Sequence, residues 1–241
     1  MNRKKLNKKQ WIAKRVATYF ESGDIVNLGV GIPSLCSDFA PDEVMFQTEN
    51  GFLGVGKEAF GLQKDPSYSD ASSREFIPQP GGVGFDSCMS FGMIRGGRID
   101  ATVLGALQVD MHGNLASWAL PNSQFGMGGA MDLVNGAKKV IVAMESCNKK
   151  GEPKILKSCT YPLTGRQCID HIVFEYGVID VKKDGLYLVE MVDCIELKDL
   201  CQIIEPNLKI SEKLKIVSMP DGCFFKEIPI LSETIKHKRA L

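Results

Sequence analysis

The sequence predicts a single α/β domain with a mixed, largely parallel sheet covered by helices. Helical and strand patterns alternate along the first two thirds of the chain, and a hairpin pattern follows in the last third. The 241 residues are 44% hydrophobic and 24% charged, which is typical of a globular protein and excludes a coiled coil or a disordered chain. The domain spans 1–241, with a basic segment (1–9) expected to be flexible and a C-terminal extension (206–241) that the pattern assigns less clearly.

The N-terminal part predicts a helix, a strand and a short second helix. Apolar residues recur at helical spacing over 8–21, and Ser22 and Gly23 end that helix. Residues 24–28 have the pattern of a buried strand. Pro33 suits the first position of a helix, so a short helix is expected over 35–39.

The middle of the chain continues the alternation after a long irregular segment. A second strand is predicted over 44–47, and the polar residues 57–80 are expected to form a long loop that is functional or mobile. A short helix is expected over 86–93 and a buried strand over 101–107. A turn follows at 111–114.

The last third adds a helix, a strand and a hairpin. Small residues at 126–129 are expected to open a helix, and 139–144 has the pattern of a third buried strand. Residues 179–181 and 186–189 flank the turn 182–185, which is a hairpin signal. We therefore expect antiparallel pairs towards one edge of the sheet.

Charge and cysteine usage exclude several classes of function. Lys and Arg total 29, as do Asp and Glu, so the basic excess of a nucleic-acid binder is missing. No apolar run is long enough to span a membrane. Eight cysteines and three histidines show no zinc-ligand spacing, so no metal is expected. Free, buried thiols and a cytoplasmic location are the expectation.

Glu49 is the strongest candidate for chemistry. It follows a predicted buried strand, where ligands bind in open α/β sheets. Gly51, Gly54 and Gly56 remove side chains near it, so a ligand can come close. Such a glutamate can act as a base, a cation ligand or a covalent nucleophile. The alternative is a cap that accepts backbone N–H groups.

Other candidates give weaker signals. The glycines of 126–133 can offer N–H groups to an oxyanion or phosphate, although no phosphate-loop or dinucleotide spacing occurs. Arg95 can pair a carboxylate or phosphate, or bond carbonyls at a helix end. His112 is expected in a surface turn, and a thiol nucleophile at Cys147 or Cys159 is a minor alternative.

Several long motifs, in order, resemble one enzyme family. Residues 47–56 resemble the Ser-Glu-Asn-Gly signature of family I coenzyme A transferases. Six further segments look like the B subunit of the butyrate/acetoacetate (3-oxoacid) type: 26–33, 85–87, 90–97, 126–139, 153–156 and 159–165. The resemblance runs from about residue 10 to 205 and implies a CoA-transferase-like fold.

The resemblance also implies a mechanism and a partner. Glu49 would attack an acyl-CoA and pass through a glutamyl-CoA thioester in a ping-pong exchange, with Gly128 and Gly129 as backbone donors. The resemblance assigns five residues to the substrate pocket: Gly31, Asn50, Gly51, Ser87 and Ser90. Coenzyme A is then a substrate, and no cofactor or metal is needed. The family's Gly-Gly-Phe motif is missing, so an A subunit and an α2β2 assembly are expected, with acyl-CoA and small carboxylic acids as ligands.

Departures from the family pattern bear on the choice of acid. Thr48 replaces a serine, 70–75 replaces Asn-Ala-Gly and its less charged sequel, and Gly84 replaces a phenylalanine. Ser117 and Asn122 also depart. We expect Gly84 and 70–75 to make room for a bulkier or more polar acid than butyrate.

Three alternatives remain open at this point. An acyl-CoA hydrolase on the same scaffold would let water resolve the anhydride. A sugar-phosphate isomerase or effector-binding module rests on fold analogy alone. A non-catalytic subunit is disfavoured by the intact Glu49.

Overall fold

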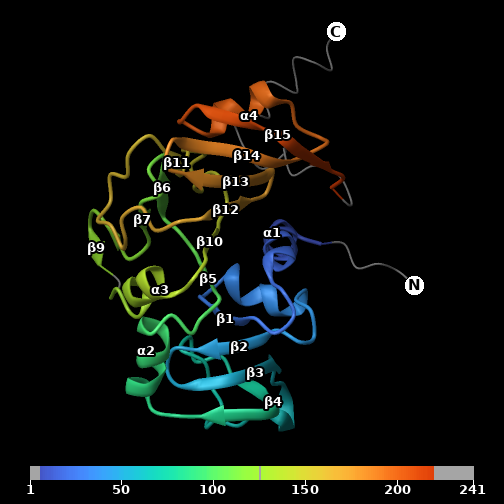
Figure 1. Cartoon of the computed structure of the whole chain (residues 1–241), viewed down its shortest axis with the longest axis vertical. Helices are drawn as coiled ribbons and strands as arrows, with labels where there is room; N and C mark the ends of the chain where they lie inside the picture. Colours follow the sequence, from blue (N-terminus) through green and yellow to red (C-terminus); the bar gives the residue numbers. More distant parts are fainter. Residues whose placement is uncertain (1–5, 125, 220–241) are drawn as a thin grey trace.

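A ten-stranded sheet forms the centre of the computed structural model, which describes residues 6–124 and 126–219 (Figure 1). The strand order is β15-β14-β13-β12-β10-β5-β1-β2-β3-β4. The five strands from β12 to β2 are parallel: β1 (Ile25–Leu28), β2 (Met45–Thr48), β5 (Ala101–Leu104), β10 (Val140–Ala143) and β12 (His171–Phe174). The predicted α/β class and mixed, largely parallel sheet are therefore confirmed.

Antiparallel pairs lie at both ends of the sheet. The predicted hairpin is formed by β13 (Gly177–Lys182) and β14 (Gly185–Val192), and β13 also pairs antiparallel with β12. At the other end β3 (Phe52–Glu58) pairs antiparallel with β2 and with β4 (Phe76–Gly84). The predicted antiparallel pairs at one edge are thus confirmed, and the structure adds a second set at the other edge, because the segment expected to be a loop supplies an edge strand.

There is a physical reason why the edge strand β4 was not predicted from the sequence. Pro78 and Pro80 interrupt its pattern, but proline is tolerated on an edge strand because the missing N–H faces no neighbour. Gly54 and Gly56, which were expected in a turn after Glu49, lie within β3. A Cβ on Gly54 would lie 2.8 Å from Gly82 Cα, and one on Gly56 would overlap the Ile77 carbonyl oxygen. These glycines therefore allow the backbone of β4 to approach.

Helices cover both faces of the parallel strands (Figure 1). α1 and the short 3-10 helix η2 pack together on one side, and α2 and α3 pack together on the other. The described helices are α1 (Lys8–Val16), η1 (Ala17–Tyr19), η2 (Pro33–Asp38), η3 (Gly61–Gln63), α2 (Ser87–Arg95), α3 (Ala130–Gly136) and α4 (Leu197–Ile203). The first helix ends earlier than predicted, since its last turn is η1.

Two hydrophobic cores result, one on each face. Ile12 of α1 packs in the same core as Ile141 of β10, whereas Val140 and Val142 of that strand belong to the opposite core with Leu133 of α3. Strands buried on both faces show continuous apolar runs instead of alternation. This explains why four of the five parallel strands were predicted from the sequence, whereas β12 was missed.

The remaining strands complete the C-terminal half. The predicted strand 101–107 ends at Leu104, where the chain leaves the large sheet. Two small sheets contain β6 (Gln108–Asp110), β7 (Leu115–Ala116), β8 (Ala119–Leu120), β9 (Ser123–Gln124) and β11 (Ile155–Leu156). β15 (Leu208–Val217) pairs with β14 in the large sheet. Residues 1–5 of the basic segment and 220–241 of the predicted extension lie outside the described residues.

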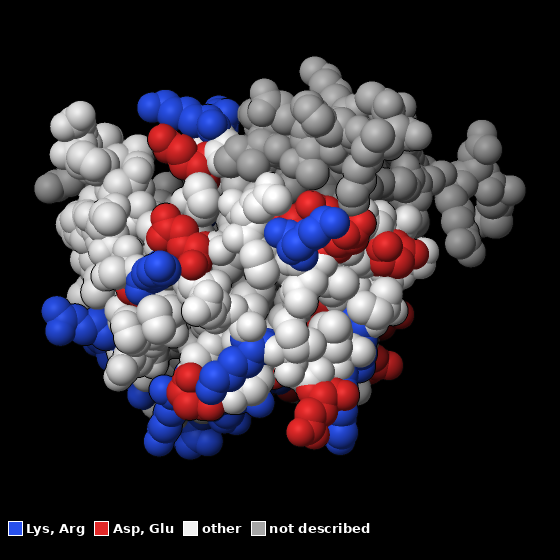
Figure 2. Space-filling model, turned by 90° about the horizontal axis from the view of Figure 1, so that it is seen from above, with Lys and Arg blue, Asp and Glu red and all other residues white. Residues whose placement is uncertain are grey.

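The surface and the cysteines refine two expectations. Figure 2 shows positive and negative side chains interspersed over one face, in line with the balanced composition. Within the described ranges, every helix is too short or too polar to cross a membrane. Cys36 and Cys147 are free and buried as predicted, but Cys88 and Cys201 are exposed and Cys194 is disulfide-bonded. The prediction of uniformly free, buried thiols is wrong because sequence alone gives neither burial nor pairing.

Candidate active site

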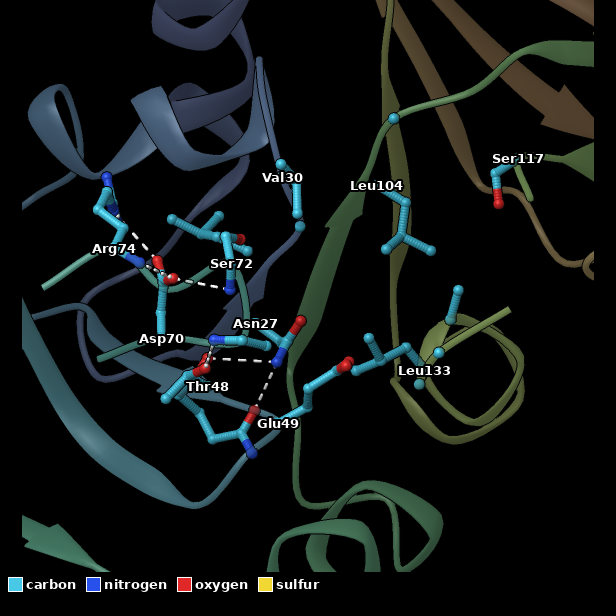
Figure 3. A pocket seen from close by; sticks show the side chains of 18 of the residues that line it. Asn27, Val30, Thr48, Glu49, Asp70, Ser72, Arg74, Leu104, Ser117 and Leu133 are labelled. Carbon is cyan, nitrogen blue, oxygen red and sulfur yellow. Dashed lines mark hydrogen bonds and ion pairs between the residues drawn. The ribbon is translucent and has the colours of Figure 1, made fainter. Parts of the chain in front are cut away.

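A cavity of about 540 Å³ opens at the carboxyl ends of β1, β2 and β5 (Figure 3). Its lining comes from five short segments: 27–30, 46–49, 70–74, 104–107 and 126–130, with further single residues that include Leu133. The chain passes from β1 to β2 on one side and returns to β5 on the other side of β1. A crevice at such a reversal is where open α/β sheets bind ligands.

Glu49 projects into this cavity. It follows the last residue of β2 and reaches toward α3, the helix that carries Leu133 (Figure 3). The Gly129 backbone N–H donates to its carboxylate. A Cβ on Gly129 would overlap Glu49 Oε2 and lie 2.8 Å from Glu49 Cδ, whereas Gly128 would place one 3.9 Å from Oε1. The structure therefore brings together Glu49, Gly128 and Gly129. Any side chain at position 129 would clash with the Glu49 carboxylate.

The surroundings raise the pKa of Glu49 above the usual range of glutamate. Burial is the main cause, since it disfavours the charged form, and the negative charge of Asp132 adds to it. The Gly129 N–H opposes both effects. Asp132 is itself paired with Arg95, whose Nε lies 2.7 Å from Asp132 Oδ1. The hydrogen bond from Gly129 thus replaces only part of the hydration that the Glu49 carboxylate loses on burial.

Glu49 is expected to destabilise the fold at neutral pH. A carboxyl whose pKa is raised by folding favours the folded state below its unfolded pKa, and that contribution is lost as pH rises through the folded pKa. Glu49→Gln keeps the shape and an acceptor for the Gly129 N–H but removes the charge. We expect its melting temperature to exceed that of the wild type at pH 7 and to converge with it near pH 4. A difference that does not change with pH would contradict this account.

Hydrogen bonds fix Thr48 and Asn50, the two neighbours of Glu49. Thr48 Oγ1 donates to Asn50 Oδ1 (2.6 Å) and accepts from the Ala71 N–H (3.1 Å). Asn50 Nδ2 donates to the Ser69 carbonyl at 2.8 Å. These bonds fasten the turn to the segment that follows β3. Thr48 keeps the hydroxyl of the serine that it replaces, so the substitution is compatible with this anchorage.

A series of buried side-chain hydrogen bonds supports the end of β2. Asn27 Nδ2 donates to Gln47 Oε1 at 2.6 Å, and Gln47 Nε2 donates to Ser90 Oγ at 2.6 Å. Ser90 is fully buried in α2 and so lies behind the strand that carries Glu49. Sequence analysis did not identify Asn27 and Gln47 as part of the site. The signal that could have found them is a polar residue within an otherwise apolar strand.

Other residues of the predicted pocket lie elsewhere. Asn50 and Gly51 line a neighbouring cavity of about 520 Å³, and Gly51 has φ +118°, with a Cβ there overlapping the Phe85 carbonyl oxygen. Gly31 and Ser87 are exposed and line neither cavity. Asn50 and Gly51 shape the turn, and the structure does not bring Gly31 or Ser87 to Glu49.

The two departures expected to alter acid choice separate in space. Gly84 lines the neighbouring cavity, where a Cβ would lie 3.6 Å from Phe52 Cδ2. It does not enlarge the Glu49 cavity, so that part of the expectation is wrong. Asp70, Ser72 and Arg74 do line the Glu49 cavity.

The minor candidates contribute no second catalytic group. Arg95 bonds the carboxylate of Asp132, and His112 is exposed in its turn. Burial raises the pKa of the Cys147 thiol and raises that of Cys159 to about 12. Thiols with raised pKa are poor nucleophiles near neutral pH.

Comparisons with known proteins agree with this geometry. The family model described as coenzyme A transferase matches residues 9–201. The beta subunit of the acetate CoA-transferase of Escherichia coli K12 is 42% identical over 212 residues, which cover 87% of this chain and 97% of that protein. A mitochondrial succinyl-CoA:3-ketoacid coenzyme A transferase of Mus musculus (2B) is 43% identical over 216 residues, covering 85% of this chain but 42% of the mouse protein.

Solved structures share the fold. An acyl-CoA transferase of Escherichia coli O157:H7 superposes with a TM-score of 0.73 at 21% identity, covering 90% of this chain and 44% of that one. Glutaconate coenzyme A-transferase of Acidaminococcus fermentans gives 0.64 at 18% identity, covering 96% and 94%. A variant of the decarboxylase AibA/AibB gives 0.68 at 17% identity, covering 92% of each chain. At these identities the likeness concerns the fold alone.

Proposed function

Because this chain belongs to the coenzyme A transferase family, we propose that it is the catalytic B subunit of an enzyme that exchanges CoA between an acyl-CoA and a short-chain carboxylic or 3-oxo acid. The observation that carries the proposal is the half-buried carboxylate of Glu49, held against the Gly129 N–H in a cavity at the carboxyl ends of parallel strands. One carboxylate suffices for this chemistry.

The proposed exchange proceeds through covalent intermediates on Glu49. Its carboxylate oxygen attacks the thioester carbonyl, the C–S bond breaks, and CoA leaves as a thiolate with a mixed anhydride on Glu49. The thiolate then attacks Glu49 Cδ and releases the first acid, which leaves a glutamyl-CoA thioester. The second acid reverses these steps. Each step replaces one activated acyl group by another, so the exchange requires no cofactor or metal beyond CoA as substrate.

The described residues would assist these steps in two ways. When Cδ becomes tetrahedral, negative charge grows on the carboxyl oxygen, and the N–H of Gly129 next to Gly128 would stabilise it. Leu104 and Leu133, which are both buried, supply apolar walls. Those walls limit access of water, which would otherwise hydrolyse the anhydride.

The proposal includes a partner subunit. The relatives of similar length are named as beta or B subunits, whereas the mouse relative is more than twice as long as the part matched here. We propose that a separate A subunit corresponds to the part of the longer relative that this chain does not match. The two subunits would form an α2β2 enzyme that binds acyl-CoA and small carboxylic acids.

Steady-state kinetics of the complex with its A subunit test transfer against hydrolysis. With butyryl-CoA and acetate as varied substrates, the proposal predicts parallel double-reciprocal lines and no release of free CoA without an acceptor acid. Stoichiometric release of CoA and butyrate without acetate would instead favour an acyl-CoA hydrolase.

The pH profile of acyl-CoA consumption should report Glu49. The reactive form is the carboxylate, and burial raises the pKa of Glu49. We therefore expect kcat/KM to fall about tenfold per pH unit below an apparent pKa higher than the ~4.3 of an ordinary glutamate. A flat profile down to pH 4.5 in a complex that remains folded would contradict this prediction.

A further inference from the structure

The loop 70–75 places an ion pair in the wall of the Glu49 cavity. Arg74 Nε lies 3.1 Å from Asp70 Oδ2, and the two side chains are 24% and 14% exposed. Both residues line the cavity, on the side of β2 opposite α3 (Figure 3). The pair is therefore partly withdrawn from water and close to the proposed reaction centre.

Arg74 is the one cationic side chain among the described residues that line this cavity. Two anionic side chains, Glu49 and Asp70, accompany it there. Because Asp70 already neutralises Arg74, the described wall offers no uncompensated positive charge. A second carboxylate on a bound acid would meet Glu49 and Asp70 without a free counter-charge.

The loop holds this pair in place. Asp70 Oδ1 accepts from the N–H groups of Ser72 (2.8 Å) and Arg74 (2.9 Å), and the Asp70 N–H donates to the Arg74 carbonyl at 2.9 Å. The Ala71 N–H donates to Thr48 Oγ1, next to Glu49. These bonds fix the Asp70 carboxylate and the Arg74 backbone, and the guanidinium itself donates to Asp70 Oδ2 and, at 3.5 Å, to the Ser34 carbonyl oxygen.

We propose that the Asp70–Arg74 pair makes the enzyme select acids with a single carboxylate and an uncharged tail over dicarboxylic acids. This inference rests on the proposed function. The reacting carboxylate becomes neutral in the anhydride, so it needs no lasting counter-charge. A second carboxylate stays ionised, and its transfer from water into the cavity is costly without a cation. Short monocarboxylates and 3-oxo acids with an uncharged tail fit this wall, and succinate does not.

Asp70→Asn tests the proposal in the complete enzyme. Asparagine keeps Oδ1 as acceptor for Ser72 and Arg74 but releases the positive charge of Arg74. The wild type is expected to prefer butyrate over succinate as acceptor. In the variant the ratio of kcat/KM for succinate to that for butyrate should rise about 10- to 100-fold, the range of a new charge-assisted hydrogen bond.

Three further variants separate charge from structure. Asp70→Asn with Arg74→Gln should return the ratio to the wild-type value, and Arg74→Gln alone should lower it, because Asp70 is then unpaired. Asp65→Asn is the matched control. Asp65, like Asp70, lies between β3 and β4, and it accepts from the Ser67 N–H (2.9 Å). It lines neither cavity, so the ratio measured for Asp65→Asn should equal that of the wild type.

Two outcomes would overturn the inference: a wild type that prefers succinate, or an Asp70→Asn ratio within twofold of the wild type. Mass spectrometry of each variant with butyryl-CoA separates this failure from failure of the proposed function. If the thioester forms but the ratio does not move, only the role of the pair is wrong. If no acyl-CoA yields a thioester, the function itself is wrong.

Discussion

Glu49→Ala in the complete enzyme is expected to lower kcat/KM for CoA transfer by about 10⁴-fold or more, because no other described group in the cavity can replace the nucleophile. Asp70, the other carboxylate of the lining, is bonded to Arg74 and to backbone N–H groups. Glu49→Gln should be equally inactive, since its amide is isosteric but cannot form the anhydride. Initial rates of acetyl-CoA formation from butyryl-CoA and acetate measure the effect.

Glu58→Gln is the matched control for this substitution. Glu58 ends β3, the strand that follows Glu49, but it is exposed and lines neither cavity, so the rate of this variant should match the wild type. If Glu49→Ala retained more than a hundredth of the wild-type rate while assembled with its A subunit, another group would be the nucleophile.

Gly129→Ala is expected to lower kcat by about 10²- to 10³-fold, the usual loss when an oxyanion donor is disturbed. The added methyl group would overlap Glu49 Oε2 and lie 3.0 Å from Phe91 Cε1, so the carboxylate must leave the N–H. Gly129 has φ −79° and ψ −1°, which alanine adopts freely. The loss should therefore come from the displaced carboxylate and not from backbone strain, and the melting temperature should stay near that of the wild type.

Gly92→Ala provides the comparison for Gly129→Ala. Gly92 lies within α2, and a Cβ added there would meet no atom within 4 Å outside the helix's own backbone. Alanine is favoured over glycine in a helix by about 1 kcal/mol, so this variant should be slightly more stable and fully active. Equal rates for the two variants would contradict the role given to Gly129.

The parallel centre of the sheet and the position of Glu49 could be predicted from the sequence. β1, β5 and β10 are buried on both faces, so their apolar runs stand out. Glu49 follows such a run, and the glycines before α3 marked the turn that meets it. These features are local, because each depends on residues that are consecutive in the sequence.

The features that were missed depend on segments far apart in the sequence. β4 was hidden by its prolines, and the reason for Gly54 and Gly56 is the backbone of β4, which the sequence does not bring near them. The chain from Asn27 through Gln47 to Ser90 joins three elements across 63 residues. Likewise, Gly84 was assigned to the wrong cavity because its distance along the chain says nothing about which side of the hairpin it faces.

Intact mass measurement of this chain, purified with its A subunit and exposed to butyryl-CoA, tests the central claim most directly. The account predicts a mass gain of one CoA less one water, located on Glu49 by peptide mapping, removed by acetate and missing from Glu49→Ala. A stable complex that turns over acyl-CoA without that adduct, or that carries it on another residue, would contradict the account.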